Sequence, residues 1–174
     1  QCKNRYRSME ELITIASGYR KKGIPLDCLV IDWLWFKEFG DLTWDSENFP
    51  DPRGGIEKLS SLGVHFMLAQ HPYIDRESLE YEKLTKLGFL TKVPPHCRPT
   101  YDFTNENARK YWWENEIYPL FRDGVRAYWT DMGEPEDDHP DTLYSVGPRE
   151  RAHNGYARCW SRALYEGQRG VSDE

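Results

Sequence analysis

The sequence predicts a parallel α/β sheet, and three observations support this. Amphipathic helix signals alternate along the chain with short apolar runs that lack the period-two pattern of half-exposed strands. A glycine separates helix from apolar run at Gly23, Gly63, Gly88 and Gly124, and glycine just after a helix is the common left-handed cap. Polar residues follow several of the apolar runs directly, as they do at the carboxyl edge of parallel sheets.

The first helix is predicted over about residues 9–22. Ser8 and Glu11 have the spacing of a capping box, in which each side chain bonds to a backbone N–H of the other's turn. The apolar run 28–31 then reads as a buried strand that ends at Asp32.

The remaining elements follow the same pattern. In order, we expect an extended loop at 49–52, a helix at 56–62, a strand at 64–69, a helix at 78–87, an irregular proline-rich segment at 93–99, a helix at 105–122, a strand at 125–129 and a helix at 153–166. Pro119 should bend or break the long helix, because proline lacks the N–H that the helix needs.

The polar groups at the three strand ends are Asp32, Gln70 with His71, and Asp131. Both a (β/α)₈ barrel and an open doubly wound sheet place their sites at this edge. A full barrel takes about 250 residues, and this chain of 174 residues shows roughly three strand–helix units. We therefore predict one domain over 1–174, about the N-terminal half of a (β/α)₈ TIM barrel and truncated at both ends. Its open sheet edges should favour self-association until the rest of the barrel completes it.

Composition and the absence of certain motifs disfavour several classes of function. The net charge of −6 disfavours a nucleic-acid partner, no apolar run reaches membrane-spanning length, and neither a P-loop nor a G-x-G-x-x-G motif is present. None of the four cysteines forms a C-x-x-C pair, which disfavours a zinc ribbon. The acidic run from Asp137 to Asp141 reads as a solvated surface rather than a calcium loop. We expect no metal and no cofactor.

The segment 128–136 carries the clearest chemical signal. Two aromatic residues precede Asp131 at the end of a predicted strand, and Glu134 follows three residues later. A carboxylate held beside flat aromatic rings suits a hydroxyl-rich ligand such as a sugar. Their positions also allow purely structural roles. Asp131 could cap the loop after the strand, and Glu134 could stabilise the same loop by hydrogen bonds without taking part in the reaction.

Further motifs occur in a fixed order along the chain. They are Tyr6-Arg7-Ser8, Gly18-Tyr19-Arg20, Gly23-Ile24-Pro25-Leu26-Asp27, Asp32-Trp33-Leu34-Trp35, Phe49-Pro50-Asp51-Pro52, His71-Pro72-Tyr73, Asp102-Phe103-Thr104-Asn105, Trp129-Thr130-Asp131-Met132-Gly133-Glu134-Pro135 and His153-Asn154-x-Tyr156. Together they resemble glycoside hydrolase family 31 almost from end to end.

The resemblance implies a retaining α-glycosidase or transglycosylase on a (β/α)₈ barrel that needs no cofactor. Asp131 matches the nucleophile that forms a covalent glycosyl-enzyme, and Asp32 matches the residue that binds sugar hydroxyls beside the scissile bond. Trp129 matches a wall of that subsite, and Trp33 a position facing it. We expect Glu134 to support the catalytic loop by hydrogen bonds, and His71 and His153 to contact sugar or to serve as hydrogen-bonded structural histidines.

The family's acid/base Asp, with an Arg and a His of the same subsite, has no counterpart in these residues. We therefore expect the isolated chain to be inactive and to need the remainder of the barrel. The segment 133–140 looks closer to α-glucosidases and α-glucan transglucosylases than to α-xylosidases, many of which carry Lys two positions before the nucleophile. The alternatives are a transglucosylase, an α-xylosidase, a catalytically incomplete carbohydrate-binding fragment, or an unrelated barrel hydrolase that uses Asp131 and a metal.

Overall fold

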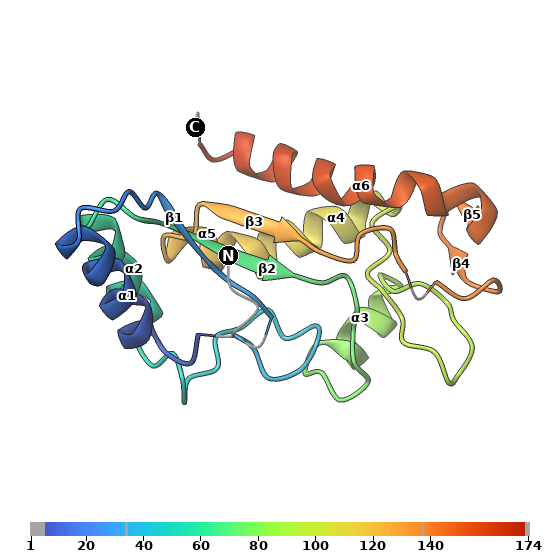
Figure 1. Cartoon of the computed structure of the whole chain (residues 1–174). Coiled ribbons are helices and arrows are strands. Elements are labelled where there is room, and N and C mark those ends of the chain that lie inside the picture. Colours follow the sequence, from blue (N-terminus) through green and yellow to red (C-terminus); the bar gives the residue numbers. More distant parts are fainter. Residues whose placement is uncertain (1–5, 34, 137, 173–174) are drawn as a thin grey trace. The chain divides into compact units, whose positions relative to one another are not determined.

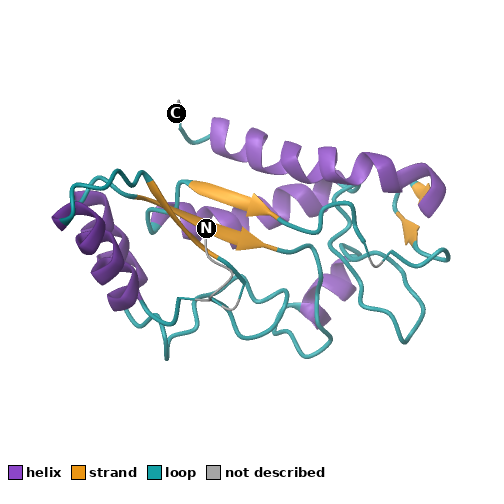
Figure 2. Ribbon diagram, viewed as in Figure 1, coloured by secondary structure: helices purple, strands orange, loops and turns teal. Residues whose placement is uncertain are grey.

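The computed structural model describes residues 6–33, 35–136 and 138–172. Its elements (Figures 1 and 2) are α1 (Met9–Lys21), β1 (Cys28–Ile31), α2 (Pro52–Ser61), β2 (His65–Gln70), α3 (Tyr81–Leu87), α4 (Glu106–Trp112), the π-helix η1 (Trp113–Ile117), α5 (Tyr118–Arg122), β3 (Ala127–Thr130), β4 (Leu143–Tyr144), β5 (Gly147–Pro148) and α6 (Arg149–Arg169). The chain divides into two compact units, Gln1–Lys37 with Thr43–Gln70 and Pro119–Trp129, and Glu38–Leu42 with His71–Tyr118 and Thr130–Glu174. None of the described helices is long and apolar enough to cross a membrane.

The first unit is built on a three-stranded sheet in the order β1-β2-β3. β1 and β2 are parallel, with Cys28 opposite His65 and Ile31 opposite Leu68. β2 and β3 also run in the same direction (Figure 2). α1 packs against α2. The predicted parallel α/β arrangement is confirmed, and over the described residues the sheet does not close, as expected for part of a barrel.

Side-chain caps set where the first two helices begin. The Ser8 hydroxyl accepts the Glu11 N–H at 3.2 Å, which confirms the predicted start of α1. α2 begins four residues earlier than the predicted helix at 56–62, because Asp51 accepts the Gly54 N–H at 3.0 Å. Pro52 lies in the first turn, where a missing N–H costs nothing. The segment 49–52 is therefore partly helical rather than wholly extended.

The long helix predicted at 105–122 is interrupted, as Pro119 requires. It divides into α4, the π-helix η1 and α5. Proline has no N–H for the preceding turn, and its ring collides with the carbonyl four residues earlier, so the backbone widens just before Pro119.

The π-helix carries a buried carboxyl group, Glu116. The Tyr101 hydroxyl donates to it. Burial raises the pKa of Glu116 well above its usual range, and the nearby Glu80 charge adds to the increase. The surroundings of this carboxyl thus favour its neutral form, and it belongs to the core of the second unit.

Aromatic rings form the core of the second unit. Phe103 stacks on Trp160 with ring centres 5.3 Å apart and meets Trp112 edge-on at 4.9 Å. The Tyr156 hydroxyl donates to the Tyr101 carbonyl at 2.7 Å, which ties α6 to the chain that precedes α4. α6 runs along α4 (Figure 1).

The sequence did not predict a small hairpin that leads into α6. Leu143 pairs with Pro148 and Tyr144 with Gly147 in two very short antiparallel strands. Gly147 has φ 127°, a conformation that favours glycine. α6 begins directly after the hairpin and is longer than the helix predicted at 153–166.

Two glycines of α6 form a matched pair for a stability test. A Cβ on Gly167 would overlap the ring of Trp113, whereas a Cβ on Gly155 meets nothing within 4 Å. Alanine gains about 1 kcal/mol of helix propensity over glycine, but overpacking costs about 1–3 kcal/mol. We expect Gly155→Ala to raise the free energy of unfolding and Gly167→Ala to lower it, as measured by urea unfolding. Equal stability of the two variants would contradict this packing.

Candidate active site

The predicted site residues divide between the two units. The first unit contains Asp32, Trp33 and Trp129, and the second contains His71, Asp131, Glu134 and His153. Two of them follow strands directly: Asp32 comes after the last residue of β1, and Asp131 after the last residue of β3.

In the first unit, Asp32 is nearly buried, with 9% of its surface exposed. Its Oδ1 accepts the N–H of Trp33 at 2.8 Å. A carboxylate accepts several hydrogen bonds, so this bond, which is the one that Asp32 makes among the described residues, orients the group and leaves it capacity for ligand hydroxyls.

The tryptophans of the first unit differ in exposure. Trp35 is completely buried and its Nε1 donates to the Ala69 carbonyl at 2.9 Å, so it belongs to the core. Trp33 is half-buried. Trp129 in β3 is 40% exposed, which leaves a large ring surface available for stacking.

Gln70 is a further polar group at a strand end. It is the last residue of β2 and is fully buried. Neither its Oε1 nor its Nε2 has a hydrogen-bond partner among the described residues. Since buried amides are nearly always bonded, this amide, unpaired among the described residues, is unusual for a strand end.

In the second unit, the Asp131 carboxylate repeats the geometry of Asp32. Its Oδ1 accepts the N–H of the next residue, Met132, at 3.0 Å. Met132 has φ 61°, and no other non-glycine residue among those described has a positive φ. Such conformations cost roughly 1–3 kcal/mol and cluster at functional sites.

The backbone after Asp131 is held against α6. A Cβ on Gly133 would lie 3.3 Å from the Trp160 ring, so this position accommodates little more than glycine. Glu134 is exposed, and no hydrogen bond or ion pair joins it to another described residue. The supporting role of Glu134 stays a prediction.

The two histidines predicted as site residues, His71 and His153, have different neighbours. The His71 ring meets Phe39 edge-on at 5.1 Å. On α6, His153 Nδ1 lies 3.2 Å from Asp138 Oδ2. The sequence did not predict this carboxylate as the partner of His153.

Asp138 was expected on a solvated surface, and this prediction is wrong. Its side chain is 3% exposed. Oδ2 accepts the Tyr144 hydroxyl at 2.8 Å and lies 3.3 Å from Arg149 Nε. Burial and the bond to Asp138 raise the pKa of Tyr144. Asp138 therefore joins the hairpin to the first two turns of α6. Asp137 lies outside the described residues.

Comparison with known proteins identifies the family. A model of the TIM-barrel domain of glycosyl hydrolases family 31 matches residues 1–174. An uncharacterized family 31 glucosidase ORF2 from Pseudescherichia vulneris is 29% identical over 185 residues, which cover 99% of this chain and 35% of that protein. The structure of a GH31 α-xylosidase from a soil metagenome, complexed with xylose, superimposes with a TM-score of 0.92 at 29% identity and covers 99% of this chain and 27% of that one.

A second structural neighbour is complexed with a different sugar. The Flavobacterium johnsoniae GH31 dextranase, complexed with glucose, superimposes with a TM-score of 0.86 at 28% identity over 97% of this chain and 23% of that one. The chain thus spans about a third or less of the length of these relatives. The predicted barrel fold and the predicted family are both confirmed. The chain belongs to glycosyl hydrolases family 31, within its TIM-barrel domain.

Proposed function

We propose that this chain carries the nucleophile of a retaining α-glycosidase and that Asp131 is that nucleophile. The observation that carries the proposal is the placement of Asp131 directly after β3, with one carboxylate oxygen bonded to the N–H of a strained Met132. Family membership supports it, because the relatives include glucosidases, α-xylosidases and a dextranase.

In the proposed reaction, a carboxylate oxygen of Asp131 attacks the anomeric carbon and the bond to the leaving-group oxygen breaks. A carboxylic acid from another part of the barrel gives its proton to that oxygen. A glycosyl ester on Asp131 results, and water activated by the same acid/base group releases the sugar with retained configuration.

The other residues bind the sugar. Asp32 accepts hydrogen bonds from sugar hydroxyls, and such bonds strengthen in the transition state. Trp129 offers its exposed ring as a stacking surface, and Trp33 lies next to Asp32 in the chain. We assign His71 and His153 to sugar contacts, and Glu134 to support of the segment that follows Asp131.

The proposed substrates are α-glucosides or related α-linked sugars. An α-xylosidase is the second candidate, because the structure with the TM-score of 0.92 is an α-xylosidase complexed with xylose. Turnover of an aryl α-glucoside compared with the matching α-xyloside separates the two. Transfer to an added sugar acceptor distinguishes a transglucosylase from a hydrolase.

A mechanism-based cyclitol inhibitor tests the nucleophile. In the enzyme that contains this chain together with the rest of its barrel, we expect one covalent label, and peptide mapping should find it on Asp131. Glu136→Gln, which changes an exposed acid five residues away, should label normally. A label on another residue, with Asp131→Asn still active, would refute the assignment.

A further inference from the structure

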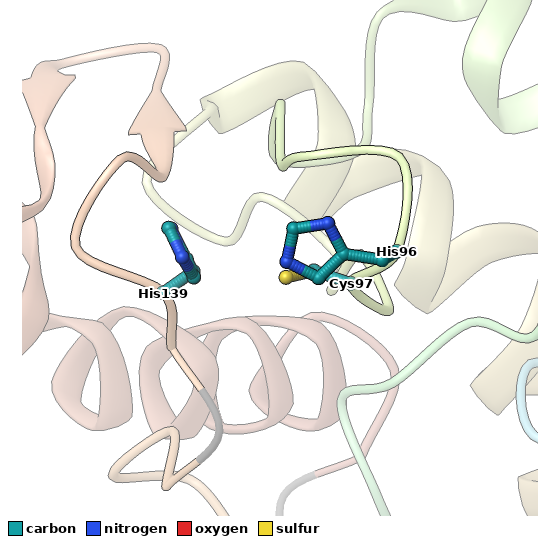
Figure 3. A group of neighbouring side chains, drawn as sticks. All are labelled: His96, Cys97 and His139. Carbon is teal, nitrogen blue, oxygen red and sulfur yellow. The ribbon is translucent and has the colours of Figure 1, made fainter.

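Three side chains of types that commonly bind metals lie close together in the second unit and have no role in the proposed sugar site. They are His96, Cys97 and His139, and one ligand atom from each lies within 4.8 Å of the others. Figure 3 shows that they come from two separate loops and that the two imidazole rings lie edge to face, with the sulfur beside the His96 ring. The ring centres are 5.8 Å apart with an interplanar angle of 87°.

Backbone pairing brings these two loops together. Lys92 N donates to the Leu143 carbonyl and Leu143 N to the Lys92 carbonyl, each at 2.9 Å. This bridge lies four residues before His96 in one loop and four residues after His139 in the other. The approach of the three side chains thus follows from a hydrogen-bonded connection between the loops.

An arginine side chain also holds the backbone of each loop by hydrogen bonds. Arg76 Nη2 donates to the carbonyl of Pro95 at 3.1 Å and to that of Cys97 at 3.2 Å. In the other loop, Arg149 Nε donates to the carbonyl of Asp138 at 3.1 Å. The backbones that carry the three side chains are therefore anchored next to the ligands themselves.

We propose that His96, Cys97 and His139 form a zinc site that clamps the proline-rich loop at 93–99 to the loop at 138–142. A thiolate with two imidazoles is a donor set that suits Zn²⁺, whereas Ca²⁺ and Mg²⁺ require oxygen ligands. None of the three residues has a role in the proposed hydrolysis, so the site is structural.

The fit requires small side-chain movements. Zn–S and Zn–N bonds of about 2.3 and 2.0–2.1 Å in a tetrahedron place ligand atoms roughly 3.3–3.6 Å apart. The three ligand atoms, which lie up to 4.8 Å apart, must therefore approach one another by about 1.3 Å for zinc to bind. His96 is exposed and is free to rotate by this amount.

The surroundings of His139 indicate what the fourth zinc ligand is. The Nδ1 of His139 now accepts the Asp141 N–H at 3.1 Å, and Asp141 Oδ2 lies 3.8 Å from the same nitrogen. Zinc bound at Nδ1 replaces that hydrogen bond, and the Asp141 carboxylate, which already lies near this nitrogen, supplies the fourth ligand directly or through water.

Cobalt substitution provides the test. The enzyme that contains this chain together with the rest of its barrel is titrated with Co²⁺ alone and then with Zn²⁺. We expect one equivalent of Co²⁺ to produce the visible bands of a tetrahedral ion and a sulfur-to-cobalt charge-transfer band, and one equivalent of Zn²⁺ to abolish both. Cys97→Ser should remove the charge-transfer band. His96→Gln and His139→Gln should each weaken Zn²⁺ binding by more than the roughly 10- to 100-fold that loss of an outer-shell partner costs.

Matched controls are available elsewhere in the chain. Cys159→Ser changes a second half-buried free thiol, and His65→Gln changes an exposed histidine of β2. Both should bind like the parent chain. Zn²⁺ should also raise the midpoint of thermal unfolding of the parent and not that of Cys97→Ser. The proposal is overturned if the parent shows no charge-transfer band, or if the control variants lose metal binding as completely as the ligand variants.

Discussion

Replacing Asp131 with alanine should lower the turnover of an aryl α-glycoside by about 10⁴-fold or more, because the covalent intermediate can no longer form. The measurement is kcat on activated and unactivated substrates, in the enzyme that contains this chain and the rest of its barrel. The loss should fall mainly on kcat, since the sugar-binding groups remain in place.

Added azide makes this prediction specific. The alanine variant leaves a space where the carboxylate was, and azide can attack the anomeric carbon from the same side. The expected product is a glycosyl azide of inverted configuration, identified by NMR, with kcat recovering as azide concentration increases. A variant that merely fails to fold shows no such recovery, which separates a chemical role from a structural one.

Glu134→Gln is the comparison variant. It keeps the shape of the side chain three residues from Asp131 and removes its charge, so a supporting role predicts a loss of about tenfold without azide rescue. If Glu134→Gln lost as much activity as Asp131→Ala and responded to azide, the roles of the two carboxylates would have to be exchanged.

The sequence predicted the elements whose signals are local. The cap at Ser8, the glycines at Gly23 and Gly63, and the helix break before Pro119 each depend on residues within one or two turns. Helix caps, left-handed glycines and proline breaks depend on nearby residues, so they can be recognised from the sequence alone. The same reasoning placed Asp32 and Asp131 at strand ends, and they directly follow β1 and β3.

Features that depend on long-range pairing were missed. The hairpin β4–β5 has only two residues in each strand, too few for a periodic pattern. The cluster of His96, Cys97 and His139 joins residues about 40 positions apart through the Lys92–Leu143 bridge, and no motif spacing announces it. Asp138 looked like one member of an acidic surface run, because nothing in the sequence shows that the hairpin folds over it.

Asp138→Ala is expected to destabilise the chain by about 1–3 kcal/mol, because it removes a buried hydrogen-bond acceptor, whereas its ion-pair partner Arg149 is 31% exposed and stays solvated. The side chain is 3% exposed and one of its oxygens serves Arg149, His153 and the Tyr144 hydroxyl together. The alanine variant leaves that hydroxyl without its acceptor, which accounts for most of this cost, and water reaching the vacated space would reduce it. Urea unfolding in the presence of a chelator measures the loss without any contribution from metal.

Two variants show which part of the loss comes from charge. Asp138→Asn keeps an oxygen for Tyr144 and removes the charge that faces Arg149, so it should fall between the parent and Asp138→Ala. Asp141→Ala removes an acid of the same sequence run that is 81% exposed, and its effect should stay within about 0.5 kcal/mol. If Asp138→Ala and Asp141→Ala were equally stable, the Asp138 carboxylate would be solvated in solution, as the sequence alone suggested. A large difference between them would instead mean that the segment after Asp131 is anchored to α6 through Asp138, so that His153 is held in place by the same carboxylate that stabilises the fold.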